Sequence, residues 1–62
     1  MKNKVKLFRQ KLKLTQQQLA DELAVSRQTI NSIETEKYEP SLQLAFSLAK
    51  YFSVKIEDIF HP

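Results

Sequence analysis

The sequence predicts an all-α fold, a compact bundle of about five short helices. Apolar residues recur at helical spacings of three and four, and several of these segments open with a Ser or Thr that suits a helix N-cap. No stretch alternates polar and apolar residues for long, so strands are unlikely. With 62 residues, we expect one domain, residues 1–62, whose small core leaves a thin margin of stability.

The first helix is expected from about Asn3 to Leu12. Val5, Phe8 and Leu12 form its apolar stripe, because they follow one another at spacings of three and four. The remaining surface is basic and holds no acid, so it either attracts phosphate at long range or is an ordinary solvated helix face. The basic residues are Lys2, Lys4, Lys6, Arg9, Lys11 and Lys13.

The second helix begins in the segment TQQQLADEL. Thr15 is a good N-cap, and Gln18, three residues later, completes the pattern of a capping box. Leu19 and Leu23 then lie on one face of this helix, and Val25 follows in a turn.

The third helix follows after only a few residues, with Ser26 as its N-cap. Ile30 and Ile33 form its inner face, and they must pack against the apolar face of the second helix. This packing turns the opposite face of the third helix outward. That face carries Arg27, Gln28, Asn31 and Ser32.

A longer irregular stretch precedes the fourth helix. Pro40 disfavours helical backbone at Glu39, and Ser41 follows as an N-cap. The apolar stripe of the fourth helix consists of Leu42, Ala45, Leu48, Ala49 and Phe52.

A short fifth helix is expected from Ile56 to Phe60.

The residue types that carry catalysis or bind cofactors are scarce. The one histidine, His61, is expected to be a solvated residue of the C-terminal tail rather than a base. Asp21 with Glu22, and Glu57 with Asp58, are sequential neighbours that do not face each other on a helix. The chain has no Cys for a thiolate metal site and no Gly for a phosphate loop. We predict no enzyme, no metal and no cofactor.

The compartment is predicted from equally simple features. No apolar run is long enough to span a membrane, and the N-terminus lacks the pattern of a signal peptide. The absence of Cys is compatible with a reducing cytosol. We therefore expect a cytoplasmic protein that does not associate with membranes.

The outward face of the third helix has the chemistry that reads DNA. An Arg side chain binds the O6 and N7 edge of guanine with two hydrogen bonds, and Gln or Asn does the same for the N6 and N7 edge of adenine. A short helix that bears these groups near its N-terminal end fits the major groove. The alternative is an ordinary exposed polar face, but such a face would hold more Glu and Lys.

The segment from Gln16 to Ile33 resembles the helix-turn-helix of the XRE family, the Cro and phage-repressor type of DNA-binding domain. The likeness extends through SRQTI, IE.EKY.PS and AKYFSVKIEDIF over almost the whole chain. It implies a lambda-repressor-like fold with the helix-turn-helix at about residues 16–35. The matching residues within the motif are Gln16, Leu19, Ala20, Leu23, Val25, Ser26, Ile30 and Ile33.

The resemblance also implies roles for individual residues. Arg9 and Glu34 match a pair that forms a salt bridge, although two unrelated surface charges are the alternative. Base-reading positions are matched by Arg27, Gln28, Asn31 and Ser32. DNA phosphate-contacting positions are matched by Gln16, Gln17, Ser26, Thr29, Lys37 and Tyr38, although an exposed loop is the alternative for the last two.

The chain departs from the family where relatives commonly have Gly. Lys13, Ala24, Glu36 and Ser53 occupy positions at which helices end in a left-handed conformation. Either this chain carries the strain that a side chain causes there, or its turns have a different shape.

These features together predict a sequence-specific transcriptional regulator that binds double-stranded DNA, more a repressor than an activator, with no small-molecule effector. It would act as a homodimer on a (pseudo)palindromic operator with half-sites about 34 Å apart. Ile56, Ile59 and Phe60 are the expected dimer contacts, unless they only close the core of one chain. The alternative is a protein-binding adaptor or antitoxin-type module, for which Leu7 and Phe46 are the plausible contact sites.

Overall fold

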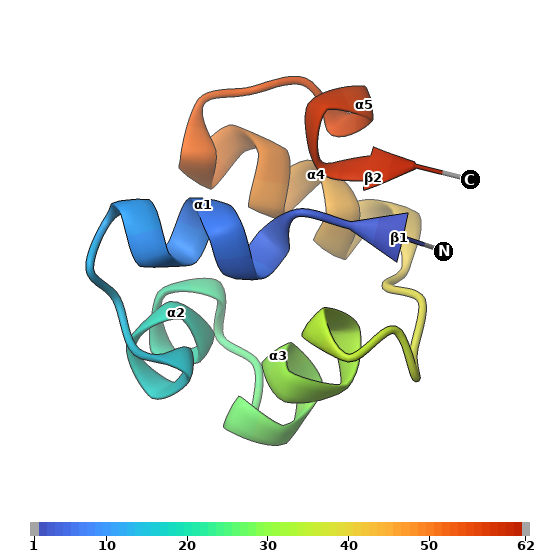
Figure 1. Ribbon diagram of the computed structural model, residues 1–62. Helices are drawn as coiled ribbons and strands as arrows, with labels where there is room; N and C mark the ends of the chain where they lie inside the picture. The colour runs from blue at the N-terminus through green and yellow to red at the C-terminus, as the bar shows by residue number, and fades with distance from the viewer. Residues whose placement is uncertain (1, 62) are drawn as a thin grey trace.

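The computed structural model describes residues 2–61, and within them the chain forms five helices around one core (Figure 1). The predicted all-α bundle is confirmed, while Met1 and Pro62 of the expected domain lie outside the described residues. The elements are β1 (Lys2–Asn3), α1 (Val5–Lys11), α2 (Gln16–Leu23), α3 (Arg27–Glu34), α4 (Leu42–Phe52), α5 (Ile56–Ile59) and β2 (Phe60–His61).

The expectation that the chain has no strands is wrong, because its two ends pair. β1 and β2 form an antiparallel ladder in which Lys2 lies opposite His61 and Asn3 opposite Phe60 (Figure 1). Two residues per strand are too few to produce a period-two pattern in the sequence. His61 is therefore a half-buried residue of this ladder and not a solvated tail residue. The fifth helix ends at Ile59, one residue earlier than expected, because Phe60 has the extended backbone of β2.

The first helix is shorter than expected at both ends. Asn3 belongs to the ladder, and its side-chain oxygen accepts a hydrogen bond from the backbone N–H of Val5 at 3.1 Å. At the other end the helix stops at Lys11, so Leu12 points outward and is 52% exposed. The assignment of Leu12 to the core is therefore wrong. The buried position on this face, besides Val5, is Arg9.

The three predicted N-caps are all confirmed. The Thr15 hydroxyl accepts from the backbone N–H of Gln18 at 3.0 Å, and the Gln18 side-chain oxygen accepts from the N–H of Thr15 at 2.8 Å. Ser26 and Ser41 each accept a hydrogen bond from the N–H three residues later, at 3.1 and 3.2 Å. These local bonds decide where α2, α3 and α4 begin.

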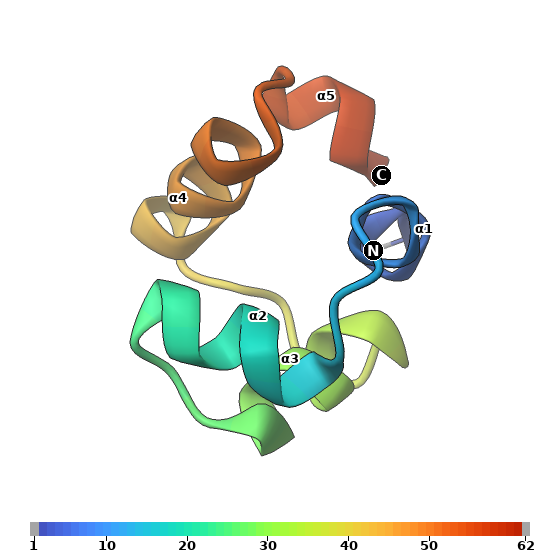
Figure 2. The same cartoon turned by 90° about the vertical axis from the view of Figure 1, so that its left-hand side faces the viewer.

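The apolar faces of α2 and α3 meet as predicted. Leu19, Ala20, Ile30 and Ile33 have no exposed surface, and the core continues through residues of α1, α4 and α5. Figure 2 shows α3 at the foot of the molecule, with α4 and α1 on opposite sides above it and α5 at the top. The outer side of α3 is therefore left uncovered by the other helices.

Aromatic side chains join α4 to the first two helices. The rings of Phe8 and Phe52 stack with centroids 5.6 Å apart. The neighbouring Tyr51 hydroxyl donates to the Glu22 carboxylate at 3.4 Å. Burial, followed by the nearby Glu22 carboxylate, raises the pKa of Tyr51 above its ordinary value. The hydroxyl therefore stays protonated at neutral pH and remains a donor that links α4 to α2.

The turns keep the left-handed conformation although no Gly is present. The φ angles are 58° at Lys13, 57° at Ala24, 64° at Glu36 and 59° at Ser53. A residue with a Cβ pays about 1–2 kcal/mol in this conformation. The chain therefore carries the strain of a side chain in the left-handed conformation, and its turns do not take a different shape.

Replacing Ala24 by Gly is expected to raise the free energy of unfolding by about 0.5–1 kcal/mol. The relief of strain at this C-cap of α2 exceeds the extra entropy that Gly loses on folding. Urea denaturation measures the change. The matched control is Ser47→Gly at an exposed interior position of α4, which should lower the same quantity by about 0.5–1 kcal/mol. Equal losses in both variants would show that the φ at Ala24 costs nothing.

Candidate nucleic-acid interface

The polar side of α3 faces solvent. Arg27, Gln28 and Asn31 are exposed and Ser32 is half-buried, whereas Ile30 and Ile33 on the opposite side have no exposed surface. Two isoleucines thus hold the helix from behind, and the guanidinium and amide groups project away from the protein. The predicted orientation of this face is confirmed.

A buried ion pair fixes the C-terminal end of α3. The Arg9 Nε donates to Oε2 of Glu34 at 2.7 Å and its Nη2 donates to Oε1 at 3.2 Å, so the pair is a two-pronged one. The two side chains are only 11% and 3% exposed. The third guanidinium nitrogen donates to the backbone oxygen of Leu14 at 2.7 Å. The expected salt bridge is present, and it ties α1 and the turn before α2 to α3.

The same carboxylate orients the first side chain of α2. The Gln16 Nε2 donates to Oε1 of Glu34 at 3.0 Å. Because a carboxylate only accepts, the Gln16 amide has one possible orientation, with its oxygen turned outward. That oxygen lies 3.5 Å from the Nδ2 of Asn31 on the outer side of α3. This distance is too long for a strong bond, but the contact gives the Asn31 amide a preferred direction beside Gln16.

The residues expected to contact phosphate lie on both sides of α3. Gln17, at the start of α2, is exposed and donates to the Asp21 carboxylate at 2.9 Å. Lys37 and Tyr38 are exposed in the loop that follows α3. Gln16, by contrast, is half-buried and already bonded to Glu34. Of these residues, Gln16 lies beside Asn31 of α3, and Tyr38 borders a hollow that Gln28 and Ser32 also line.

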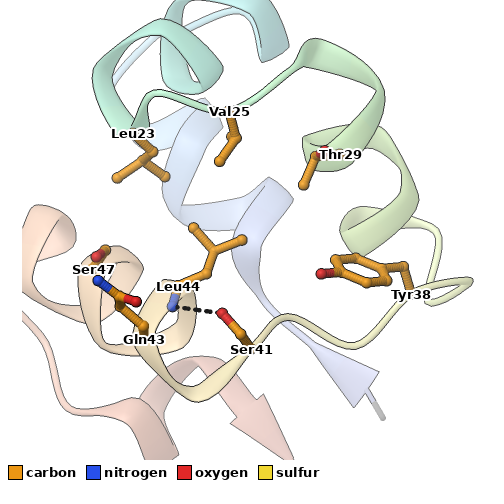
Figure 3. Close-up of a pocket in the computed structure, with 8 residues that line it drawn as sticks. All are labelled: Leu23, Val25, Thr29, Tyr38, Ser41, Gln43, Leu44 and Ser47. Carbon is orange, nitrogen blue, oxygen red and sulfur yellow. Dashed lines mark hydrogen bonds between the residues drawn. The ribbon is translucent and has the colours of Figure 1, made fainter.

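Ser26 and Thr29 bond to each other. Their hydroxyl oxygens are 2.9 Å apart, and the Ser26 oxygen also accepts from the backbone N–H of Thr29. Figure 3 shows the Thr29 side chain above the ring of Tyr38, and both residues line a hollow between α3, α4 and the loop. This hollow has a volume of about 360 Å³. Thr29 therefore lies at the edge of the outer side of α3 and not at its centre.

Tyr38 has a position that the sequence did not indicate. A second hollow, of about 250 Å³, lies between this ring and the side chains of Ser26, Gln28, Thr29 and Ser32. Tyr38 thus borders the predicted base-reading residues directly. The left-handed backbone at Glu36 lies between α3 and Tyr38, at one of the positions where the resemblance to the family had indicated such a turn.

The three residues expected in a dimer contact differ in accessibility. Ile59 has no exposed surface and Phe60 is 7% exposed, so both close the core of a single chain. Ile56 is half-buried and keeps part of its side chain at the surface. Ile59 and most of Phe60 therefore close the core of one chain, which was the alternative to a dimer contact.

Comparisons with known proteins agree with this geometry. A family model described as Helix-turn-helix matches residues 5–59. A protein of Methanocaldococcus jannaschii is 63% identical over 60 residues, which cover 97% of this chain and 91% of the relative. A protein of Archaeoglobus fulgidus is 48% identical, and YgzD of Bacillus subtilis 47%, each over 97% of this chain and over 84% and 91% of the relative. All three are named uncharacterized HTH-type transcriptional regulators.

Within residues 2–61, no helix is both long and apolar enough to cross a membrane.

Proposed function

The chain belongs to this helix-turn-helix family, the XRE family that its sequence resembles, and we propose that it is a sequence-specific transcriptional regulator of double-stranded DNA. Membership and the names of the relatives also confirm that it is not an enzyme. We propose repression as its action, because occupying an operator is sufficient for repression, whereas activation needs a further contact. The relatives are archaeal and bacterial, and we place the protein in the cytoplasm, where such cells keep their DNA.

The orientation of α3 is the observation that carries the proposal. Its exposed Arg27, Gln28 and Asn31 have the donors and acceptors that distinguish base pairs in the major groove. Because buried Ile30 and Ile33 hold the helix from behind, these groups enter a groove without first rearranging the core. Ser32 is the fourth proposed base-reading residue, at the half-buried edge of this side.

Phosphate contacts on both sides of α3 would position the helix in the groove. We assign them to Gln16 and Gln17 on the α2 side and to Lys37 and Tyr38 on the loop side. The hydroxyls of Ser26 and Thr29 are further proposed contacts at the start of α3. Such contacts carry no sequence information but supply much of the affinity.

A homodimer would read a (pseudo)palindromic operator. Twofold symmetry places two recognition helices in successive turns of the major groove, about 34 Å apart. One chain measures 25 × 23 × 19 Å, so two chains side by side are large enough to span this distance. Ile56, with the small exposed part of Phe60, remains in the proposed contact.

A protein-binding adaptor on the same scaffold is the alternative function. An adaptor that used α3 would present apolar residues on its outer side, but the outward side chains there are Arg27, Gln28, Asn31 and Ser32. The described outer side of α3 therefore favours DNA over a protein partner.

Selection of bound sites from a random DNA pool tests the proposal. The expected result is an enriched inverted repeat whose half-site centres are about 10 base pairs apart. The matched control is Arg27→Glu, which changes one exposed side chain at the start of α3 and should enrich no site. Recovery of random sequences by the unaltered chain would contradict sequence-specific binding.

A further inference from the structure

The side-chain amide of Asn3 joins two separate parts of the fold. Its Oδ1 accepts a hydrogen bond from the backbone N–H of Val5 at 3.1 Å, and its Nδ2 donates to the backbone oxygen of Ile33 at 2.8 Å. Because an N–H only donates and a carbonyl oxygen only accepts, the amide has one possible orientation. Asn3 therefore bonds to the start of α1 and to the C-terminal end of α3 at the same time.

The backbone around Asn3 is held independently of this side chain. Asn3 lies opposite Phe60 in the terminal ladder, and the N–H of Lys4 donates to the oxygen of Ile59 at 2.8 Å. Ile59 has no exposed surface and Phe60 is 7% exposed. In Figure 1 the end of α3 lies below β1. The side chain that reaches α3 thus extends from a backbone that is bonded to core residues.

Two directional contacts restrain the end of α3. Apolar packing is non-directional, so Ile33 holds this end against the core without fixing its rotation about the helix axis. Hydrogen bonds are directional. One set joins Arg9 to Glu34, and the other joins Asn3 to the oxygen of Ile33. Because they bind neighbouring residues of α3 from different points along the first segment of the chain, together they oppose rotation and tilting of this end.

The turn after α3 uses the same carbonyl group. The oxygen of Ile33 also accepts from the N–H of Glu36 at 3.0 Å, and the oxygen of Ser32 accepts from the N–H of Lys37 at 2.9 Å. Glu36 has the left-handed φ of 64°. A carbonyl oxygen has two acceptor sites, and Asn3 occupies the second one on Ile33. Asn3 therefore also supports the start of the loop that follows α3.

We propose that Asn3 is a positioning residue for base reading. Asn31 and Ser32 are the proposed base-reading residues nearest the end of α3 that Asn3 holds, whereas Arg27 lies at the other end. Asn3 should therefore set the direction of Asn31 and Ser32 and leave Arg27 unaffected. The inference rests on the proposed regulator for the contact with DNA. Asn3 lies outside residues 5–59, the part of the chain that the family model matches.

Binding titrations with Asn3→Ser test the inference. The Ser hydroxyl can accept from the N–H two residues later, as the Asn side chain does, but it is too short to donate to Ile33. The measured quantity is the affinity for the selected operator divided by the affinity for the operator changed at the base pair that Asn31 reads. That base pair is the one at which Asn31→Ala loses its preference. The ratio should fall about threefold to tenfold, the value of one hydrogen bond, while the preference at the base pair read by Arg27 stays unchanged.

The matched control is Ser41→Ala. It removes a single side-chain hydrogen bond at the N-cap of α4, which has no bond to α3. It should therefore lower the stability of the chain without altering the ratio. Equal falls in the two variants would show that Asn3 contributes to stability alone. An equal loss of preference at the base pair read by Arg27 would also overturn the inference.

A second variant covers the case in which Asn3→Ser loses its helical circular dichroism. Asn3→Asp keeps the shape of the side chain and the acceptor for Val5, but it replaces the donor to Ile33 by a second acceptor. Its added negative charge weakens binding to all DNA alike, so the ratio of the two affinities cancels this effect. The ratio should fall as in Asn3→Ser. An unchanged ratio would overturn the inference.

Hydrogen exchange of the free protein separates this inference from the proposed function. The N–H groups of Glu36 and Lys37, which bond to the last turn of α3, should exchange at least about threefold faster in Asn3→Ser than in Ser41→Ala. Equal exchange in the two variants would overturn the inference. An unaltered chain that selects no operator would overturn the proposed function, and the exchange rates alone would then decide whether Asn3 positions the end of α3.

Discussion

Replacing Arg9 by Met is expected to lower the free energy of unfolding by about 3–5 kcal/mol. The substitution leaves the Glu34 carboxylate, whose side chain is 3% exposed, without the cation that compensates its burial. The backbone oxygen of Leu14 loses its donor at the same time. For a domain of 62 residues, this loss approaches the whole stability, which typically is about 5 kcal/mol or somewhat more. Urea denaturation followed by circular dichroism measures it.

The control for this prediction is the double variant Arg9→Met, Glu34→Leu. Removing both charges avoids an unpaired buried carboxylate, and apolar replacements of a buried ion pair are often neutral or stabilising. The double variant should therefore recover most of the lost stability, although Gln16 no longer has the carboxylate that orients it. A loss below about 1 kcal/mol in Arg9→Met alone would mean that solvent screens the pair as it does at a surface.

Replacing Arg27 by Ala is expected to weaken binding to the selected operator by about 1–3 kcal/mol and to relax the preference at one base pair of each half-site. Arg27 is the first residue of α3 and is exposed, so the substitution should leave the fold intact. Titration against the operator and against its single-base-pair variants measures both effects.

Lys37→Ala is the matched control for Arg27→Ala. Lys37 is also an exposed basic residue, but it lies in the loop after α3, where a phosphate contact is proposed. Its loss should weaken binding to operator and random DNA alike. If Arg27→Ala showed the same equal loss, Arg27 would be a phosphate contact and not a base-reading residue.

The starts of α2, α3 and α4 were predictable because their causes are local. Thr15, Ser26 and Ser41 each bond to a backbone N–H only three residues away, so a short stretch of sequence contains both partners. The inward positions of Ile30 and Ile33 follow from their spacing in the same way. The orientation of the candidate base-reading residues depends on these features, and it was therefore predictable as well.

Most of the features that the sequence missed depend on residues far apart in the chain. The apolar stripe placed Leu12 in the core, but the helix ends first, and Arg9 is buried because the fold brings Glu34 beside it from 25 residues away. The ladder between Lys2 and His61 joins the two ends of the chain. The resemblance to a family suggested the ion pair, whereas neither local propensity nor spacing indicated the ladder. The sequence also did not indicate that Tyr38 borders the same hollow as Gln28, because that hollow forms only once the loop lies against α3.

The central claim is that the outer side of α3 contacts base edges in the major groove, and guanine N7 provides the most direct test. Each guanine of the selected operator is replaced in turn by 7-deazaguanine, which lacks this acceptor, and binding is titrated with the unaltered chain and with Arg27→Ala. We predict that one replacement in each half-site weakens the unaltered chain and leaves Arg27→Ala unaffected, because an Arg contact needs both O6 and N7. Equal sensitivity of the two proteins at every guanine would contradict the claim.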